Sequence, residues 1–267
     1  MIKFIATDLD GTLLDEQKRL PAEIFPLIEE LHRLGVLFAP ASGRQYANLQ
    51  QLFAPVADKV LFICENGALV AYQGKTLYCN PIADEALPAA LDEIRALPHL
   101  FPMLCGSGCA YIENDDEPFY GYATHAYTNC KRVNSLNEVI GKEAVCKIAV
   151  YDGISAAENC MKHLPQRLPA LRTIISGYDW CDVSSPTANK GEAIRFIRNA
   201  FHLKKEECAA FGDHMNDYEM LLECGEAYVT ENAYPPLKKI IHRTVPANTE
   251  GGVLLMLDEM LKQIKGE

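Results

Sequence analysis

The feature that most restricts the fold of this chain is the alternation of short apolar runs with amphipathic stretches near both of its ends. In the first part, apolar runs at 2–8, 36–42 and 59–67 are separated by stretches with helical periodicity at 21–35 and 43–56. Strands that alternate with helices in this way form parallel βαβ units. We therefore predict an α/β fold of the Rossmannoid kind, with a parallel-sheet core and helices on both of its faces.

The alternation stops in the middle of the chain and resumes near residue 189. Residues 83–184 mix helical and strand patterns with an aromatic-rich patch at 118–127, which indicates a separate α+β unit. The elements expected there are helices at 84–97 and 156–164 and strands at 143–151, 171–178 and 180–185. We predict a core built from residues 1–82 and 185–267, with an inserted domain at 83–184.

Composition narrows the class of protein. The formal charge of −11 argues against a broad nucleic-acid surface, and it means that an anionic substrate must be attracted by local cations. None of the ten cysteines forms a CxxC pair, so the common zinc spacing is missing. The first apolar run is broken by Asp8, and no apolar stretch approaches the roughly 20 residues of a membrane span, so we expect a soluble, reduced, cytoplasmic protein.

Two aspartates stand where the first apolar run ends. Asp8 and Asp10 are two residues apart, so both carboxylates can point to the same side of a strand. Like charges this close repel each other when both are ionised. A strand that ends in an ordinary Asp-Gly turn is the structural alternative. A calcium loop starting at Asp8 is excluded, because Thr12, Leu13 and Arg19 stand where an EF-hand needs an acid, a glycine and a glutamate.

Two more polar clusters follow apolar runs of the predicted sheet. Ser42, Gly43 and Arg44 lie at a strand-to-helix junction, where Ser42 is either an ordinary N-cap or part of an anion site. Lys190 lies at the start of a predicted helix, where its charge opposes the helix dipole. A solvated lysine is the ordinary explanation for this residue.

A last cluster, in the sequence GDHMNDYEML, contains Asp213, Asn216 and Asp217. Ligands of parallel sheets bind beyond the carboxyl ends of the strands, so we expect the four aspartates of these clusters to converge there. Without a cation they would repel one another. Mg²⁺ prefers hard oxygen ligands and commonly joins carboxylates to a substrate phosphate, and an aspartate can serve as the nucleophile of phosphoryl transfer.

The sequence resembles the haloacid dehalogenase superfamily of phosphotransferases, and within it is most similar to the Cof-type phosphatases with a subclass IIB cap. The resemblance covers both outer segments, about 1–82 and 185–267. The family motifs fall on Asp8 to Thr12, Ser42 to Arg44, Asn66 to Ala68, Lys190, Gly212 to Leu221, and Asn248 with Gly252 and Val253. The resemblance implies a haloacid dehalogenase-like core and an inserted α+β cap of the C2B type.

The resemblance also implies a role for each motif residue. Asp8 would attack phosphorus, and Asp10 would protonate the leaving oxygen and then activate water. The residues expected to bind Mg²⁺ are Asp8, Asp10 through its backbone carbonyl, and Asp213, with Asp217 in or near the outer shell. The residues expected to bind phosphate are Ser42, Gly43, Lys190, Asn216 and Leu9.

Other positions are expected to contact the substrate less directly. The residues expected to face the substrate or the cap are Arg44, Asn66, Arg172, Tyr178 and Trp180, with packing or solvent exposure as the alternative for the cap residues. His214 occupies a position usually filled by a small or polar residue, and we interpret it as an exposed loop histidine. Residues 229–233 depart from the usual turn of the family, away from the chemistry.

Together these features predict a Mg²⁺-dependent phosphatase of small phosphorylated metabolites, with sugar phosphates as the default substrates and an aspartyl-phosphate intermediate. We expect a monomer or weak homodimer that binds a small-molecule phosphoester, no nucleic acid and no membrane. A phosphomutase of sugar phosphates is the alternative, and it would require a phosphoenzyme shielded from water. A receiver domain also pairs acids at a strand end, but receivers are much shorter and lack such an insertion.

Overall fold

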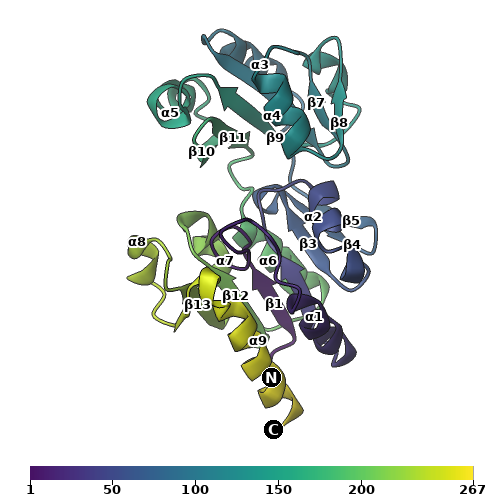
Figure 1. Cartoon of the computed structure of the whole chain (residues 1–267). Helices are drawn as coiled ribbons and strands as arrows, with labels where there is room; N and C mark the ends of the chain where they lie inside the picture. The colour runs from purple at the N-terminus through teal and green to yellow at the C-terminus, as the bar shows by residue number, and fades with distance from the viewer. Residues whose placement is uncertain (267) are drawn as a thin grey trace. The chain divides into compact units, whose positions relative to one another are not determined.

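The computed structural model describes residues 1–266, and the chain forms two compact units. Unit 1 contains Met1–Arg44, Leu49–Tyr78 and the C-terminal part from Asn189 onward. Unit 2 contains Gln45–Asn48 and Cys79–Ala188. Figure 1 shows the elements of both. No helix within residues 1–266 is long and apolar enough to span a membrane.

Unit 1 is built on a parallel sheet. Its five strands, in the spatial order β14-β13-β12-β1-β2, are β14 (Thr244–Val245), β13 (Glu226–Thr230), β12 (Cys208–Gly212), β1 (Phe4–Thr7) and β2 (Leu37–Pro40). The inner strand β1 is fully buried, and Phe4 lies opposite Leu37 on one side and Cys208 on the other. Strands buried on both faces read as continuous apolar runs, which explains the sequence of residues 2–8.

A second sheet extends unit 1 beyond β2. It consists of the antiparallel strands β3 (Leu61–Cys64), β4 (Leu69–Tyr72) and β5 (Lys75–Cys79). β3 also meets β2 through two parallel bridges, Phe38 with Val60 and Ala41 with Ile63. The turn between β4 and β5 has two left-handed residues, Gln73 and Gly74, as the tight turns of β-hairpins require.

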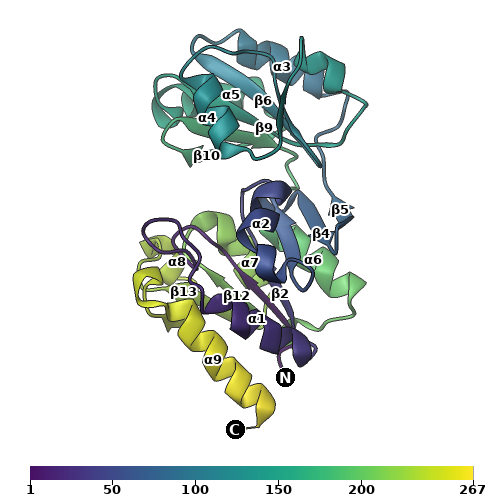
Figure 2. The same ribbon diagram turned by 45° about the vertical axis from the view of Figure 1, so that its right-hand side comes forward.

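Helices cover both faces of the parallel sheet, as predicted from the sequence. The helices of unit 1 are α1 (Ile24–Arg33), α6 (Lys190–Ala200), α7 (Tyr218–Leu222), α8 (Pro235–Lys238) and α9 (Gly252–Lys265), and α2 (Tyr46–Leu52) straddles the division between the units. Figures 1 and 2 show α1 and α9 side by side, and Lys265 pairs with Glu30 at 2.8 Å. α6, α7 and α8 bury apolar side chains such as Ile194, Leu221 and Leu237 against the other face.

Unit 2 is an α+β domain around one six-stranded sheet. Its strands, in the order β10-β11-β9-β6-β7-β8, are β10 (Arg172–Gly177), β11 (Trp180–Ser184), β9 (Val145–Asp152), β6 (Leu100–Gly106), β7 (Ala110–Ile112) and β8 (Cys130–Arg132). All neighbours are antiparallel except β7 and β8. α3 (Leu87–Arg95) and α5 (Met161–Arg167) share one apolar core with the sheet, and α4 (Phe119–Ala126) shares a second.

The sequence predicted part of unit 2. The predicted helices at 84–97 and 156–164 and the three predicted strands are present as α3, α5, β9, β10 and β11. The strands β6, β7 and β8 and the helix α4 were missed. In α4 the aromatic side chains obscure the helical pattern, because only Phe119 and Ala123 are buried while Tyr120 and Tyr122 are exposed.

Candidate active site

Polar residues follow three strands of unit 1 directly. Asp8 follows β1, Ser42 lies just beyond β2, and Asp213 follows β12, while Lys190 is the first residue of α6. The backbone N–H of Asp8 donates to the carbonyl of Phe211 at 2.9 Å, which carries the β1–β12 pairing one residue further. Three of the four aspartates expected to converge at the carboxyl ends of the strands, Asp8, Asp213 and Asp217, do lie together there, whereas the carboxylate of Asp10 does not join them.

Lys190 lies at the centre of this group and is fully buried. Its ammonium group donates to Asp8 Oδ1 and to Asp217 Oδ1, the latter at 2.6 Å. The side chain of Asn189 caps α6 by accepting a hydrogen bond from the N–H of Glu192 at 2.9 Å, which fixes the start of the helix. Burial alone would lower the pKa of Lys190. The negative charges of Asp217 and Asp8 have the larger combined effect and raise this pKa above its ordinary value.

Three carboxylates share this small volume. One oxygen each of Asp8, Asp213 and Asp217 lies within 4.8 Å of the others. The second oxygen of Asp217 accepts hydrogen bonds from the N–H groups of Asp213 and His214, at 3.0 and 3.2 Å. Thr12 donates its hydroxyl to Asp213 Oδ1 at 3.2 Å. Thr12 thus orients the carboxylate of Asp213, and Asp217 holds the backbone of the loop that carries it.

The electrostatics of the group favour an added cation. Burial, followed by the charge of Asp217, raises the pKa of Asp8 to about 8, and burial raises the pKa of Asp213 to about 6. When all three carboxylates are ionised, the one buried ammonium leaves two negative charges uncompensated. Carboxylate oxygens in this arrangement match the hard ligands that Mg²⁺ prefers, so the donor set fits a divalent cation of that kind.

The loop that carries the two N-terminal aspartates is held from the C-terminal part of the chain. Gly11 has a φ of +87°, and a Cβ there would overlap the carboxylate of Asp213, so this position requires glycine. The carbonyl of Gly11 accepts from Asn232 Nδ2 at 2.8 Å, and Asn248 Nδ2 donates to the carbonyl of Leu14 at 2.8 Å. The departure at 229–233 therefore touches this loop, which the sequence analysis did not foresee.

The carboxylate of Asp10 lies outside the group of three and pairs with Arg44 instead. The guanidinium binds both oxygens, with Nη2 at 2.9 Å from Oδ1 and Nε at 3.2 Å from Oδ2. The side chain of Asp10 is 45% exposed and that of Arg44 is 29% exposed. Arg44, expected to face the substrate, thus orients the carboxylate of Asp10.

The loop Ser42–Gly43–Arg44 is held by the turn that follows β3. The N–H groups of Asn66 and Glu65 donate to the carbonyls of Ser42 and Arg44, at 3.0 and 3.2 Å. A Cβ on Gly43 would lie 3.0 Å from the Asn66 side chain. The N-cap interpretation of Ser42 is wrong, because α2 begins only at Tyr46 and the Ser42 hydroxyl accepts from the N–H of Arg44 at 3.3 Å.

The remaining predicted residues of unit 1 lie in the same loops. Leu9 is fully buried, and its carbonyl accepts from the N–H groups of Leu13 and Leu14. Asn216 lies in the short helical turn η6 (Met215–Asp217) and is half-buried. His214 is exposed, as expected, and its ring centroid lies 5.0 Å from that of Tyr234.

The predicted cap residues belong to unit 2. Arg172 Nη1 donates to the carbonyl of Ala188 at 3.3 Å. Tyr178 is 79% exposed. Trp180 packs on Tyr151 and Phe119, with ring centroids 5.4 and 6.4 Å away, so it is part of the aromatic core of this unit. Their contact with a leaving group stays a prediction.

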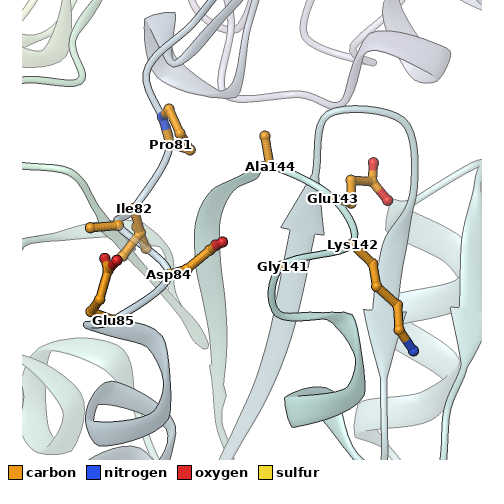
Figure 3. A pocket seen from close by; sticks show the side chains of 9 residues that line it. Pro81, Ile82, Asp84, Glu85, Gly141, Lys142, Glu143 and Ala144 are labelled. Carbon is orange, nitrogen blue, oxygen red and sulfur yellow. The ribbon is translucent and has the colours of Figure 1, made fainter.

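Unit 2 also contains a pocket of about 470 Å³, lined by residues 81–85 and 141–144. Figure 3 shows the carboxylate of Asp84 directed toward the segment of residues 141–144, whereas Lys142 points away. The carboxylate of Glu143 accepts hydrogen bonds from the N–H of Cys109 and the hydroxyl of Tyr111. An acidic side chain without a directed cation does not suit an anion, so we place the phosphate chemistry in unit 1.

Comparison with known proteins agrees with this geometry. The profile of the haloacid dehalogenase-like hydrolases matches residues 5–257. The chain is 26% identical to the 5-amino-6-(5-phospho-D-ribitylamino)uracil phosphatase YbjI of Escherichia coli, over 98% of this chain and 97% of the relative. It is 28% identical to the HMP-PP phosphatase of Cronobacter sakazakii, over 89% of this chain and 87% of the relative.

Solved structures give the same result. A protein from Eubacterium rectale superposes with a TM-score of 0.88 at 25% identity, covering 97% of this chain and 99% of that one. TM0651 from Thermotoga maritima superposes with a TM-score of 0.86 at 25% identity, covering 97% of each chain. This chain belongs to the haloacid dehalogenase-like hydrolases and is a phosphoester hydrolase of their Cof type.

Proposed function

We propose that this haloacid dehalogenase-like hydrolase is a Mg²⁺-dependent phosphatase of small phosphorylated metabolites that works through an aspartyl-phosphate on Asp8. The observation that carries the proposal is the group of Asp8, Asp213 and Asp217 around Lys190, in which all but the half-buried Asp213 are buried. In this group Asp8 supplies a nucleophile, the excess of carboxylates can bind a cation, and the ammonium of Lys190 can bind phosphate oxygens. Phosphoryl transfer requires little else besides a proton donor.

In the first half of the reaction, Asp8 attacks the substrate. A carboxylate oxygen of Asp8 forms a bond to phosphorus while the bond from phosphorus to the leaving oxygen breaks. Asp10 supplies the proton that the leaving oxygen needs, as its place two residues after Asp8 suggests. Lys190, the hydroxyl of Ser42 and the N–H groups of the loop around it stabilise the negative charge on the phosphoryl oxygens.

In the second half, water releases the phosphate. Asp10 takes a proton from the water, whose oxygen bonds to phosphorus while the bond from phosphorus to Asp8 breaks. The guanidinium of Arg44 binds both oxygens of Asp10 and so holds this carboxylate in place. Free phosphate leaves and Asp8 returns to its starting state.

The carboxylates suit a resident Mg²⁺, which Asp8, Asp213 and the backbone carbonyl of Asp10 would hold, with Asp217 in or near the outer shell. Bound there, the ion would supply positive charge against the reacting carboxylate and the phosphoryl oxygens. This fits the raised pKa of Asp8, about 8 without a cation, because a nucleophilic carboxylate has to be ionised. Asp217 holds its place by accepting hydrogen bonds from the backbone and from Lys190.

The substrate is a small phosphate monoester, with sugar phosphates as the default. The relative from Escherichia coli is named for a compound whose phosphate is carried by a ribityl chain attached to a uracil ring. A phosphorylated polyol chain is chemically close to a sugar phosphate, so both kinds belong in one panel of substrates. We assign the choice of leaving group to unit 2, where the exposed ring of Tyr178 is a candidate contact.

The test measures phosphate release from p-nitrophenyl phosphate and from a sugar phosphate panel, with Mg²⁺ or with EDTA. We expect turnover that requires Mg²⁺ and that falls by about 10³-fold or more in Asp8→Asn, since this change removes the nucleophile but keeps its shape. Asp258→Asn, a surface change on α9, is the matched control. Turnover that persists in Asp8→Asn would overturn the assignment, and isomerised sugar phosphate without free phosphate would indicate a mutase.

A further inference from the structure

Two thiols meet where the chain enters unit 2. Cys79 is the last residue of β5 and the first residue of the long segment Cys79–Ala188 of unit 2, and Cys146 is the second residue of β9. Their sulfur atoms are 3.8 Å apart, so one thiol donates a hydrogen bond to the other. Cys79 is half-buried and Cys146 is fully buried. We propose that Cys79 and Cys146 form a reversible dithiol–disulfide site that a peroxide oxidises.

The neighbouring contacts hold the two cysteines in this register. The N–H of Ile82 donates to the carbonyl of Val145 at 2.8 Å, which fixes the chain after Cys79 against the start of β9. Asn80 donates to the hydroxyl of Thr187 at 2.9 Å, next to the point where the chain returns to unit 1. These contacts hold the two segments together, and bond formation would bring the sulfur atoms from 3.8 Å to about 2.05 Å.

Access and reactivity differ between the two thiols. The hydrogen bond from Cys146 lowers the pKa of the Cys79 thiol, and this effect outweighs burial and the nearby carboxylate of Glu143. Cys79 is partly exposed whereas Cys146 is fully buried, so a small oxidant reaches Cys79 first. Cys79 is thus the first nucleophile and Cys146 the resolving thiol.

The chemistry balances with hydrogen peroxide as oxidant. The Cys79 thiolate attacks one peroxide oxygen, the O–O bond breaks, and hydroxide leaves to become water. The Cys146 thiol then attacks the sulfur of the Cys79 sulfenic acid, the S–S bond forms, and a second water leaves. Two thiols lose two electrons and two protons, and the peroxide becomes two waters. An added thiol reverses the reaction by exchange.

Other cysteines of unit 2 serve as controls. Cys130 is also half-buried, but burial raises its pKa to about 11. Cys160 and Cys181 interact with each other, but both are fully buried, and the pKa of Cys160 is raised well above its ordinary value. We therefore expect peroxide to act on Cys79 before it acts on these residues.

The test treats the full-length protein with hydrogen peroxide, blocks the remaining thiols with N-ethylmaleimide, and maps the peptides by mass spectrometry. We expect a Cys79–Cys146 disulfide peptide to appear first and to disappear on addition of dithiothreitol. Cys79→Ser and Cys146→Ala each abolish the peptide, and Cys160→Ser retains it. The experiment detects a disulfide and does not measure phosphatase activity, so its result does not depend on the phosphatase assignment.

A measurement on the unaltered protein covers the case in which Cys146→Ala does not fold. Before oxidation, Cys79 should react with N-ethylmaleimide at least about 10-fold faster than Cys130, because its thiolate fraction is larger. After oxidation, Cys79 and Cys146 should be protected together. A disulfide that joins Cys109 to Cys130 instead, or oxidation of Cys79 to a sulfinic acid without any bond to Cys146, would overturn the proposal.

Discussion

Each unit buries one lysine in contact with carboxylate groups, but the carboxylate groups around the two lysines differ. Lys190 in unit 1 donates to Asp8 and Asp217, and Asp213 lies beside them. Lys147 in unit 2 pairs with the carboxylate of Asp182 at 3.0 Å, and both side chains are only 4% exposed. Negative charge is in excess around the first lysine and balanced around the second.

The balanced pair is completed by neighbours that need no ligand. The second oxygen of Asp182 accepts a hydrogen bond from the hydroxyl of Ser176 at 3.1 Å, and the Lys147 ammonium lies 5.9 Å from the centroid of the Tyr127 ring. A buried pair of this kind is close to neutral for stability, whereas an uncompensated charge is costly. An excess of buried carboxylates therefore indicates a site that takes up a cation, and a balanced pair indicates structure.

The largest expected effect comes from breaking the unbalanced group. Lys190→Met removes the ammonium that we propose binds the phosphoryl oxygens, so kcat/KM for a phosphate monoester should fall by about 10³-fold or more. The measurement is steady-state phosphate release with saturating Mg²⁺, after circular dichroism has confirmed the fold. A loss below about 10-fold would mean that Lys190 only balances charge, as Lys147 does.

Breaking the balanced pair should affect stability rather than chemistry. Lys147→Met leaves the carboxylate of Asp182 buried without its cation, so the free energy of unfolding should fall by about 3–5 kcal/mol. The double change Lys147→Met with Asp182→Leu should recover most of this loss, since no buried charge remains. Urea unfolding of the unaltered protein, the single variant and the double variant measures these differences in the free energy of unfolding. A double variant as unstable as the single one would contradict the balanced-pair interpretation.

The sequence predicted the unbalanced group better than the balanced pair, for a physical reason. In the parallel α/β core, Asp8 and Asp213 follow strands, and Lys190 begins a helix. Such positions lie at the same edge of the sheet regardless of loop conformation. Lys147 and Asp182 meet through the register of two antiparallel strands, which the sequence does not specify. The pairing of Asp10 with Arg44 and the bond from Asn232 to Gly11 were likewise unpredictable, because they depend on side-chain conformations in loops.

Adding Mg²⁺ should sharpen the comparison, because only the unbalanced group needs it. At a concentration 100-fold above its dissociation constant, a ligand stabilises the folded state by about 2.7 kcal/mol, which corresponds to a rise in Tm on the order of 5 °C. Thermal unfolding with Mg²⁺ or EDTA measures the shift. Lys147→Met should keep the shift, and Asp213→Asn should lose most of it.

The same shift should depend on pH in a defined direction. The pKa of Asp8 rises from 3.8 to about 8 in the metal-free fold, so its proton contributes stability that is complete below about pH 4 and lost as the pH rises toward 8. A cation replaces this proton and binds better when the proton is absent. The Mg²⁺-dependent rise in Tm should therefore be larger at pH 8 than at pH 6. An equal rise at both values would contradict the raised pKa.

The smallest expected effects come from removing two hydroxyl groups, each of which donates a hydrogen bond to an aspartate of one of the two groups. Thr12 donates to Asp213 at 3.2 Å in the unbalanced group, and Ser176 donates to Asp182 at 3.1 Å in the balanced pair. Thr12→Val should lower the affinity for Mg²⁺ about 10-fold, since neighbours of ligands orient them. Ser176→Ala should cost about 1 kcal/mol of unfolding free energy and leave that affinity unchanged.

Both variants are measured in two ways. Calorimetric titration gives the affinity for Mg²⁺, and urea unfolding gives the free energy of unfolding. Because the lost contact is nearly the same, a difference between the variants must come from what surrounds each carboxylate. Asp213 has an excess of negative neighbours, so its orientation controls how a cation is held. Asp182 is already neutralised by Lys147, so its orientation controls only packing. If Ser176→Ala weakened Mg²⁺ binding as much as Thr12→Val does, charge balance would not distinguish the two sites.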